Sequence, residues 1–590
     1  MKYTLAHVTH EAVNKIGGIG TVLEGLMTSP VYQEHVGRSI LVGPTSAQLE
    51  VDPANRLGPS GEVLYSSVDE IDKKGLGPRL HPIEWAFNVS LVYGRRTYEI
   101  PGDDRRGAAD VLLIDVFNTN PDRLALFKLR LAERLRVDST AYEKAWDYEE
   151  YVRLAEPAFY ALMALLQPDE LPCILFAHEF MGLPTAFKAI FDGPDYFRTI
   201  FHAHECATAR NLVEHHVGHD TMFYNVMRQA RARDLYVEDV FGDQSAHFRH
   251  ALVSQAHVCD GVIAVGDETA AEMHFLGQHF DHHHIDLVYN GVPVVAVDLK
   301  RKQRAREMLQ DYAQQLLGHR PDVLMTHVMR PVISKGIWRD LSVCSHLDGH
   351  LGGEGRTAVL FILTSAGGTR RPQDVRTMEA EYNWPRAHRD GYPDLVGPEV
   401  EYNQLVERFN LTHEHVQVIL VNQFGWDRAT IGQRLPESMH ITDLRVAADV
   451  ELGMATYEPF GISPLEPLCA GAICVISSVC GCAGFVDLAS EGEGSANVLV
   501  ADFTEIDQQL SIEQLLKMTR EQRDQVESRV SREVAEELMR RLPNSEDARA
   551  VLVESGQQLA LRMGWDRVVE QALVPMLQRV QNEEPVPQLA

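Results

Sequence analysis

Short apolar runs that alternate with helical patterns recur along most of this 590-residue chain. Such runs, bounded by polar or glycine-rich segments, are typical of strands buried in a parallel sheet. Strands that alternate with helices predict doubly wound α/β domains. The predicted strands are KYTLAHVTH (2–10), SILVG (39–43), VLLIDV (111–116), CILFAH (173–178), RTIFHAH (198–204), GVIAVG (261–266), IDLVYNG (285–291), DVLMTHVMR (322–330), AVLFILTS (358–365), VQVILVN (416–422), VELGMAT (450–456) and ICVISS (473–478).

The predicted strands fall into two groups, separated by a polar stretch of helical character, DLKRKQRAREMLQDYAQQLL (298–317). One group ends near residue 294 and the other begins near residue 322. A chain of 590 residues is also too long for one hydrophobic core. We therefore expect two Rossmann-like domains, over about 1–295 and 296–562. In open sheets of this kind ligands bind beyond the carboxyl ends of the strands, so functional residues are expected there.

The composition limits the partners of the protein. Apolar residues make up 45% of the chain and charged residues 24%, as in ordinary globular proteins, and the formal net charge is −29. This acidity argues against nucleic acid and anionic membrane surfaces as partners. We find no secretion leader and no apolar run of about 18 residues, and the eight cysteines form no CxxC pair. We therefore expect a cytoplasmic protein with reduced thiols and no membrane partner.

A lysine and three glycines follow the first predicted strand, in EAVNKIGGIGTVLEGL (11–26). Glycine lets backbone N–H groups approach a ligand closely, and a helix N-terminus adds partial positive charge. Lys15, Gly17 and Gly18 are therefore candidates for binding an anion or a sugar phosphate. A tight strand-to-helix turn with an exposed lysine explains the same pattern, and this stretch alone does not choose between the two.

The segment TYEPFGISPLEPLCAGAICVISS (456–478) carries two carboxylates eight residues apart. Glu458 lies in the loop after a predicted strand, and Glu466 lies about one turn into a helix. The amides of Gly461 and Ile462 would face a phosphate, and the two carboxylates could take hydroxyl groups at different depths. The alternative is a capped helix that carries two ordinary acids.

Further candidates lie at the ends of other predicted strands. Arg330 ends the first strand of the second group and Lys335 follows it, so two cations could stabilise a diphosphate leaving group as its charge grows. His178 and His204 end strands of the first group, and Arg210 follows them. Each of these residues, taken alone, is equally compatible with a structural or solvated role.

Histidine is frequent, with 26 in the chain, and the densest cluster is HFDHHHID (279–286). Because this cluster precedes a predicted strand, a solvated loop is favoured over a metal site. The chain also has no H-E-x-x-H motif. We therefore assign no metal-binding residues.

Taken in order, these motifs resemble one family, the glycogen and starch synthases, and most closely the eukaryotic-type glycogen synthases. EAVNKIGGIGTV is similar to E-x-x-N-K-x-G-G-I-x-T-V, HEFMG (178–182) to H-E-W-x-A-G, and TIFHAHECATAR (199–210) to T-x-F-x-x-H-A-T followed by an arginine. YEPFGISPLEPL (457–468) is similar to Y-E-P-W-G-x-x-P-x-E, and Arg330 with Lys335 to R-x4-K. VGDETAAEMHFL, VYNG and MGWDRVVEQAL resemble further motifs of the family.

The resemblance implies the GT-B fold, in which two Rossmann-like doubly wound domains face each other across a cleft. The first would be the acceptor-side domain, with a C-terminal helix at about 563–585 crossing back to it, and the second would bind the nucleotide sugar. The resemblance also implies retaining transfer of glucose from UDP-glucose or ADP-glucose to the non-reducing end of an α-1,4-glucan. No metal or other cofactor would be needed, and we expect a homo-oligomer.

By the same resemblance each motif residue receives a role. The catalytic residues would be His204 beside the anomeric carbon, Glu458 at the glucose hydroxyls, and the two cations at the departing diphosphate, Arg330 and Lys335. Tyr457 would stack near the base and Glu466 would bind the ribose. The full set of donor-binding residues would be Lys15, Gly17, Gly18, Arg210, Asn290, Tyr457, Gly461, Ile462 and Glu466.

Three functions stay open at this point. The first is a glycogen synthase, the second is a GT-B enzyme that makes a small glycoside on an acceptor such as a sugar phosphate, and the third is a non-catalytic sugar-binding protein. The intact cations and Glu458 argue against the third, but motifs that bind the donor do not separate the first two. The chain also departs from the family at CGCAGF (480–485), in the acid-diluted arginines of 518–541, and in an insertion at 369–403.

Overall fold

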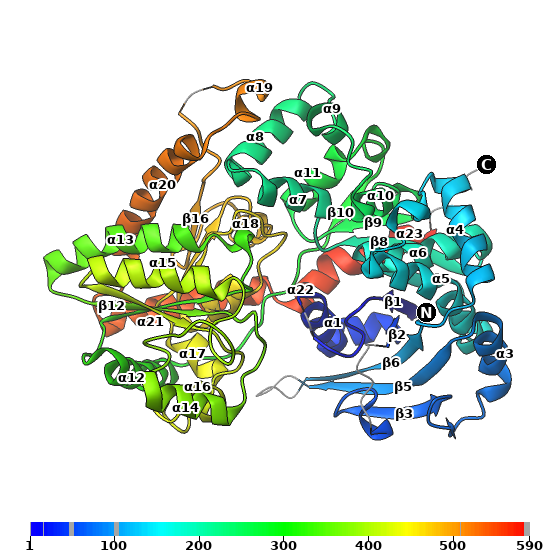
Figure 1. The fold of residues 1–590 in the computed structure, drawn as a ribbon, viewed down its shortest axis with the longest axis horizontal. Helices are drawn as coiled ribbons and strands as arrows, with labels where there is room; N and C mark the ends of the chain where they lie inside the picture. Colours follow the sequence, from blue (N-terminus) through cyan, green and yellow to red (C-terminus); the bar gives the residue numbers. More distant parts are fainter. Residues whose placement is uncertain (1, 16, 46–51, 100–104, 508, 583–590) are drawn as a thin grey trace. The chain divides into compact units, whose positions relative to one another are not determined.

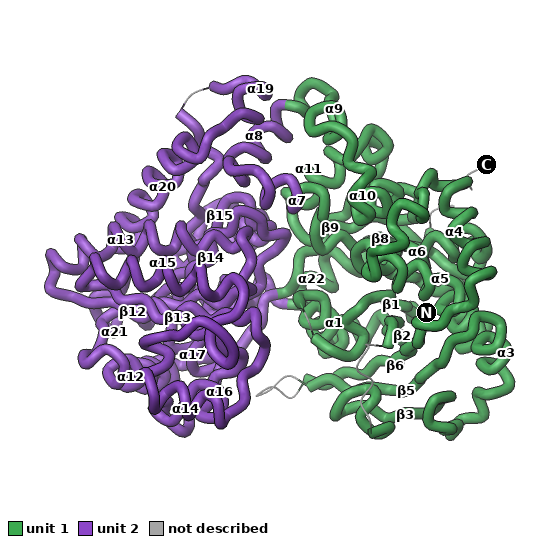
Figure 2. Tube along the Cα trace, in the orientation of Figure 1, with its two compact units in different colours: residues 1–209, 230–291, 565–590 green, residues 210–229, 292–564 purple. Residues whose placement is uncertain are grey.

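The computed structural model describes residues 2–15, 17–45, 52–99, 105–507 and 509–582. Its contacts divide the chain into two compact units (Figure 2). Unit 1 comprises residues 1–209, 230–291 and 565–590, and unit 2 comprises residues 210–229 and 292–564. Each unit holds its own β-sheet with helices packed on it.

Among the described residues, the sheet of unit 1 has ten strands in the order β10-β9-β8-β7-β1-β2-β6-β5-β3-β4 (Figure 1). The strands from β10 to β6 run parallel, and β5, β3 and β4 extend them by antiparallel pairing. The bounds are β1 Tyr3–Val8, β2 Val36–Pro44, β3 Gly61–Ser66, β4 Ile71–Asp72, β5 Ser90–Glu99, β6 Arg106–Asp115, β7 Cys173–His178, β8 Phe197–Ala203, β9 Gly261–Ala264 and β10 Ile285–Leu287.

The apolar runs predict every parallel strand of unit 1 but none of its antiparallel extension. In β5 only the first half is continuously buried, and the second half is largely exposed from Arg95 onward. A strand at the solvated end of a sheet carries polar side chains, so it does not read as an apolar run. The extension therefore could not be found by the criterion that found the parallel core.

Helices surround the sheet of unit 1. α5 packs against α3 and α6, and α6 packs in turn against β7 and β8. The helix bounds are α1 Ile19–Thr28, α2 Pro30–His35, α3 Gly77–Phe87, α4 Pro121–Leu135, α5 Trp146–Leu165, α6 Glu179–Asp192, α9 Val237–Phe241, α10 Phe248–Val253, α11 Asp267–Phe275, α22 Trp565–Val568 and α23 Val574–Asn582. α7 (Ala207–His215) begins in unit 1 and ends in unit 2.

The described sheet of unit 2 has six parallel strands in the order β13-β12-β11-β14-β15-β16. Side chains alternate between two buried faces, because Val359 and Phe361 of β12 lie in one apolar cluster while Leu360 and Ile362 lie in the other. The strand bounds are β11 Val323–Val328, β12 Ala358–Leu363, β13 Val416–Val421, β14 Val450–Gly453, β15 Ile473–Ser477 and β16 Val498–Ala501.

The two faces of this sheet are covered by different helices. α13, α15 and α20 supply apolar side chains to one cluster, and α12, α14 and α17 supply them to the other. The bounds are α8 His219–Arg231, α12 Leu299–Leu317, α13 Ile337–Glu354, α14 Pro372–Tyr382, α15 Glu399–Thr412, α16 Arg428–Ile431, α17 Ile441–Ala447, α18 Cys482–Ala489, α19 Ile512–Leu515, α20 Arg520–Arg541 and α21 Glu546–Arg562.

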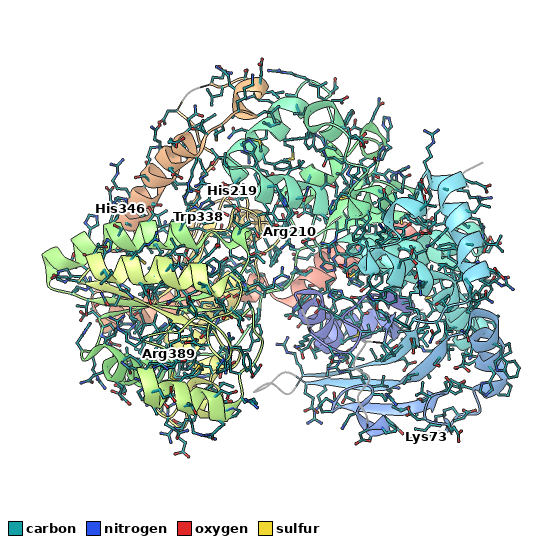
Figure 3. The ribbon with its side chains drawn as sticks, viewed as in Figure 1. Lys73, Arg210, His219, Trp338, His346 and Arg389 are labelled. Carbon is teal, nitrogen blue, oxygen red and sulfur yellow. The ribbon has the colours of Figure 1, made fainter. Side chains whose placement is uncertain are left out.

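Residues 210–229 belong to unit 2, although the sequence places them inside the first domain. The reason is a buried ionic cluster on α8, where Asp220 receives the guanidinium of Arg339 at 2.6 Å and Arg339 also reaches Glu527 at 2.9 Å. Asn225 adds a hydrogen bond to the carbonyl of Thr504 at 2.7 Å. On the same helix His219 lies beside Trp338 of α13, with ring centroids 5.4 Å apart (Figure 3).

The end of the chain returns to unit 1 through Trp565. A Cβ at Gly25 would lie 2.0 Å from Trp565 Nε1, and one at Gly291 would lie 2.5 Å from its ring, so both glycines make room for the indole. The chain continues through a π-helical turn, Val569–Leu573, into α23. The helical residues thus run without a gap from Trp565 to Asn582 with the π turn inside them, and residues 583–585 of the expected helix lie outside the described residues.

The polar insertion at 369–403 is built into unit 2 by a buried arginine. Arg370 pairs with Glu399 at 2.6 Å and donates to Ser365 Oγ at 2.6 Å. Asp394 accepts hydrogen bonds from Tyr382 and Asn422 in the same network. The insertion thus has a structural anchor. No helix in the described part of the chain is both long and apolar enough to span a bilayer.

Candidate functional site

Each sheet has a topological switch point beside its first strand, where the chain stops adding strands on one side of that strand and begins to add them on the other. In unit 1 the strands β2 to β6 all lie on one side of β1, and the chain then returns to β7 on the other side. In unit 2 it runs from β11 through β12 to β13 and then returns to β14 on the other side of β11. Ligands of doubly wound sheets bind beyond the carboxyl ends of the strands at such points. Lys15 follows β1, Lys335 follows β11 and Glu458 follows β14, whereas His204 follows β8 and Asn290 follows β10.

In unit 2 the two switch-point loops meet through an ion pair. Lys335, after β11, contacts the carboxylate of Glu458, after β14. The backbone N–H of Thr456 also donates to the carbonyl of Ser334 at 2.7 Å, which holds the two loops together. Arg330 is exposed, and its guanidinium has no hydrogen bond or ion pair among the described residues. The structure thus brings one paired and one free cation to this switch point.

The loop after β14 requires a glycine at residue 461. Gly461 has φ +92°, and a Cβ there would lie 2.6 Å from Cys480 Sγ. Neither the N–H of Gly461 nor that of Ile462 donates a hydrogen bond within the described part of the chain. The helix that follows, Ser463–Ala470, is a 3₁₀ helix with Pro464 in its first turn and Pro467 inside it. Two unpaired amides at a helix start suit an anion.

Glu466 lies in the first turn of this 3₁₀ helix and is 37% exposed at its side chain. Arg445 of α17 lies 2.9 Å from its carboxylate and 2.8 Å from that of Glu451, which is fully buried. The guanidinium of Arg445 also donates to the carbonyl of Ser463. Arg445 therefore fixes the carboxylate of Glu466 in place while leaving part of it open to a ligand.

Tyr457 does not present a ring face in this structure. Its side chain is 3% exposed and belongs to the interior of unit 2. Stacking on a nucleotide base would require this ring to become uncovered. The predicted role of Tyr457 is therefore the donor-binding assignment in unit 2 that fits the observed geometry least well.

In unit 1 the glycine motif is closed by the chain's own carboxylate. Glu11 is buried, and it accepts hydrogen bonds from the N–H of Gly17 at 3.0 Å and from that of Gly20 at 2.8 Å. A Cβ at Gly20 would lie 2.7 Å from Glu11, whereas a Cβ at Gly18 would have nothing within 4 Å. The amide of Gly17, one of the two glycines predicted to face a ligand, is thus occupied, and the other, Gly18, lies beside open space.

Lys15, the predicted cation of the glycine motif, is paired with a carboxylate. Lys15 has a 44% exposed side chain and contacts the carboxylate of Glu24 on α1. A surface pair of this kind contributes little to stability, so it leaves the lysine able to exchange partners. Arg210 on α7 is similarly engaged, with Glu214 one turn further along at 3.0 Å.

Histidines occupy the switch point of unit 1. His178, the last residue of β7, lies between His7 of β1 and His204, which follows β8. Its Nε2 is 3.0 Å from His7 Nδ1, and its Nδ1 is 2.8 Å from His204 Nε2. Burial lowers the pKa of His7 and that of His204 to about 3, and it lowers the pKa of His178 well below the usual range. These rings are therefore neutral at physiological pH.

A fourth histidine, His202, pairs in register with His178 across β7 and β8. It is 4% exposed, and neither of its ring nitrogens has a hydrogen-bond partner among the described residues. Nitrogens of His178, His202 and His204 lie within 4.8 Å of one another. However, the rings of His202 and His204 stack, with centroids 3.9 Å and planes 27° apart. Lone pairs in nearly parallel rings do not converge on one ion, so this arrangement suits stacking better than metal binding.

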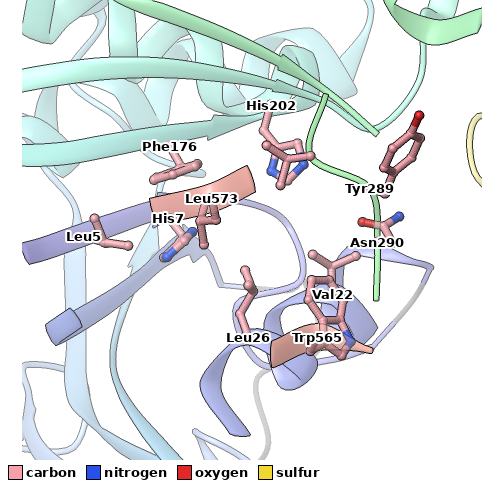
Figure 4. Close-up of a pocket in the computed structure, with 11 residues that line it drawn as sticks. Leu5, His7, Val22, Leu26, Phe176, His202, Tyr289, Asn290, Trp565 and Leu573 are labelled. Atoms are coloured by element: carbon pink, nitrogen blue, oxygen red, sulfur yellow. The ribbon is translucent and has the colours of Figure 1, made fainter. Parts of the chain in front are cut away.

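Asn290, a predicted donor-binding residue, lines a small cavity of unit 1 with His7, His202 and Trp565 (Figure 4). The cavity measures about 10 Å³, which holds one water at most and no sugar. Asn290 therefore lies next to the histidines but in a closed space.

Reasoning from the sequence missed four residues that organise these groups: Glu11, His7, His202 and Arg445. A signal existed for His202, because the spacing in HAH places it two residues before His204 on the same strand face. His7 likewise lies in the predicted strand that precedes the glycine motif. Arg445 lies on α17, and its partner Glu466 lies beyond the next strand, β14, so no local pattern connects the two residues.

The chain was compared with known proteins. No protein-family model matches it, and no curated protein matches it by sequence. Among solved structures, the catalytic domain of Arabidopsis thaliana starch synthase IV bound to ADP and acarbose is 15% identical, with a TM-score of 0.52 over 99% of this chain and 100% of that one. An E. coli trehalose-6-phosphate structure with bound UDP-2-fluoro glucose is 12% identical, with a TM-score of 0.51 over 99% and 100%. A trehalose-6-phosphate synthase is 12% identical, with a TM-score of 0.50 over 99% of this chain and 100% of that one.

These likenesses extend over nearly the whole of each chain, but the identities are low. They show a shared fold, and with the two parallel-sheet units they confirm the GT-B architecture that the motifs predict.

Proposed function

We propose that this protein is a retaining glucosyltransferase of the glycogen synthase type, which transfers glucose from UDP-glucose or ADP-glucose to the non-reducing end of an α-1,4-glucan. The observation that carries the proposal is the switch point of unit 2. There Lys335 contacts the carboxylate of Glu458, and a Cβ at Gly461 would lie 3.0 Å from Glu458 Cγ. Arg330 follows the same strand as Lys335, and the amides of Gly461 and Ile462 are unpaired among the described residues. A diphosphate and a sugar are the ligands that such a set recognises.

In this proposal Lys335 changes partners when the donor binds. It contacts Glu458 in the structure, and a diphosphate would draw its ammonium away and leave the carboxylate free for glucose hydroxyls. The charge on the leaving diphosphate grows as the glycosidic bond breaks, and the two cations stabilise it without a metal. Glu466, held by Arg445, would bind the ribose.

The remaining predicted residues keep the roles that the resemblance gives them. His204 would lie beside the anomeric carbon, Lys15 and Gly18 would contact the donor, and Asn290 and Arg210 would support the site. No carboxylate is assigned to a covalent intermediate. We therefore propose transfer on one face of the sugar, in which the leaving phosphate accepts the proton of the acceptor hydroxyl.

A second candidate is transfer of glucose to a small acceptor such as a sugar phosphate. The structural likeness to a trehalose-6-phosphate synthase favours keeping it, since the donor-binding groups discussed above do not define the acceptor. We also propose that the protein is cytoplasmic. We further propose that it forms a homo-oligomer, which a measurement of its mass in solution would test.

The test is a donor-by-acceptor assay with purified full-length protein. UDP-glucose and ADP-glucose are each offered with glycogen, with glucose 6-phosphate and with water alone. Growth of glycogen by α-1,4 linkages supports the synthase, and nucleotide release only with the small acceptor supports the second candidate. Glu458→Gln should abolish either transfer, while Glu513→Gln, which changes an exposed carboxylate of unit 2, should retain it. Absence of transfer from both donors to both acceptors would contradict the proposal.

A further inference from the structure

Five side chains of unit 1 form one continuous hydrogen-bonded chain that ends at His204. Ser39 Oγ is 2.8 Å from Tyr32 OH, and Tyr32 OH is 3.3 Å from His7 Nε2. His7 Nδ1 is 3.0 Å from His178 Nε2, and His178 Nδ1 is 2.8 Å from His204 Nε2. Every nitrogen of His7 and His178 is used, so these two rings have no hydrogen-bonding capacity left over.

The proton positions in this chain depend on one another. A neutral imidazole has one N–H donor and one acceptor nitrogen, so in each ring the bond made by one nitrogen decides the role of the other. Burial lowers the pKa of all three rings, which keeps them neutral. The chain therefore has two possible directions, and a choice made at Tyr32 is passed on to His204.

The chemistry of Tyr32 selects one direction. A phenol is a stronger hydrogen-bond donor than a neutral imidazole, and a bare imidazole nitrogen is a stronger acceptor than a phenolic oxygen. Burial raises the pKa of Tyr32, so the hydroxyl keeps its proton, and Ser39 can donate to the same oxygen. Tyr32 thus donates to His7 Nε2, His7 Nδ1–H to His178, and His178 Nδ1–H to His204 Nε2.

We propose that Tyr32, His7 and His178 are positioning residues that hold His204 in the tautomer with its proton on Nδ1. The ring of His204 then offers an N–H donor from its Nδ1 edge, because Nε2 is occupied by His178. His204 serves as a neutral hydrogen-bond donor to an oxygen of the substrate and accepts no proton. The role toward substrate rests on the proposed function, whereas the tautomer does not.

His202 provides the internal contrast. It lies opposite His178 in the sheet and stacks on His204, yet neither of its nitrogens joins the chain. Burial alone therefore does not bring a histidine into the hydrogen-bonded chain. The alignment of Tyr32 on α2 with His7 on β1 and His178 on β7 forms this chain, and it is centred on the switch point between β1 and β7.

The direct test is ¹⁵N NMR of the histidine side chains in full-length protein, with resonances assigned by single His→Asn variants. We expect Nδ1–H tautomers at His7, His178 and His204, with no protonation down to pH 5. In Tyr32→Phe, which removes only one hydroxyl, the three rings should change to mixed tautomers. Tyr196→Phe, at a half-exposed tyrosine of unit 1, should leave them unchanged. An Nε2–H tautomer at His204 in the wild type, or no response to Tyr32→Phe, would overturn the proposal.

Kinetics provides the second readout. His7→Leu removes the donor to His178, whereas the side-chain amide of His7→Asn can replace it at the position of Nδ1. We expect His7→Leu to lower kcat on the order of 10-fold to 100-fold with little change in KM, and His7→Asn to restore most of the loss. Equal losses in both variants would mean that the residue only fills space. If the wild type transfers no glucose, the proposed function fails, and the NMR experiment still tests whether Tyr32, His7 and His178 set the tautomer of His204.

Discussion

The two switch points of this molecule carry opposite kinds of polar chemistry. In unit 1 the strand ends bring together neutral histidine rings, which burial keeps unprotonated. In unit 2 they bring together ions, and most of these are compensated by a partner, as Lys335 is by Glu458 and Arg445 by Glu451 and Glu466. One fold therefore uses the same position in two sheets for two different environments.

The difference shows how each unit satisfies buried polar groups. A buried ion is tolerated when an opposite charge and hydrogen bonds surround it, which requires residues from several elements. A histidine can instead lose its proton and be satisfied by one neighbour on each side. We expect unit 2 to be sensitive to loss of a charge, and unit 1 to be sensitive to gain of a proton.

The largest expected effect comes from removing a buried cation of unit 2. Arg339 is 0% exposed and holds Asp220 and Glu527, so Arg339→Ala leaves the buried carboxylate of Asp220 without its cation and leaves Glu527 with Arg523 as its cation. We expect a loss of about 3–5 kcal/mol in the free energy of unfolding, measured by denaturant titration. Arg529→Ala, which removes a more exposed arginine of α20, should cost about 1 kcal/mol or less. Equal losses in the two variants would mean that burial of the ion is not what matters.

The next effect is on catalysis. Lys335→Ala removes the cation that is proposed to stabilise the leaving diphosphate, and we expect kcat with the active donor to fall by about 10²- to 10³-fold. Lys517→Ala changes an exposed lysine of unit 2 and should leave kcat unchanged. A Lys335→Ala protein that folds normally and keeps its turnover would remove Lys335 from the catalytic residues.

A smaller effect is expected from protonating unit 1. The pKa of His7 is lowered to about 3 in the folded protein, so the unfolded chain binds more protons between pH 3 and about 6.5. Stability should therefore fall as the pH drops below about 6.5, by about 1.4 kcal/mol per pH unit for this residue. Between pH 6 and pH 5, the unfolding free energy of His7→Asn should therefore fall by about 1.4 kcal/mol less than that of the wild type. Parallel pH dependences would contradict the role of burial at His7.

The smallest effect separates the two glycines of the N-terminal motif. Gly20→Ala should destabilise the protein by about 1 kcal/mol, because its Cβ would meet the carboxylate of Glu11 at 2.7 Å. Gly18→Ala should change stability by about 0.5 kcal/mol or less, since its φ is −80° and its surroundings are open. If Gly18 contacts the donor, Gly18→Ala should nevertheless weaken nucleotide-sugar binding in calorimetry. Unchanged binding would leave Gly18 without a ligand role.

Much of the architecture could be predicted from local pattern. The apolar runs locate the parallel strands of both sheets except β16, and the motifs predict the GT-B fold that the structure shows. The antiparallel extension was missed because half-solvated strands lack continuous apolar runs. The assignment of residues 210–229 differs because it depends on Asp220, Arg339 and Glu527, which are far apart in the sequence.

The candidate site divides in the same way. Lys335 and Glu458 were named from their positions after strands, and the fold joins them because β11 and β14 are neighbours. Tyr457 was named from a motif, and its burial could not be known from neighbouring residues. The motif predicts an open amide at Gly17, but Glu11 folds back on it and on the amide of Gly20.

By itself, the sequence determined the strand-and-helix alternation, the number of sheets and the residues that follow each strand, because these depend on hydrophobic period and on local turns. Only the tertiary structure decided which of those residues are free, paired or buried. His7, His178 and His204 come from three separated segments, and their hydrogen bonds exist because parallel pairing aligns β1, β7 and β8. Contacts of that kind depend on how strands are ordered in space, and no local pattern encodes that order.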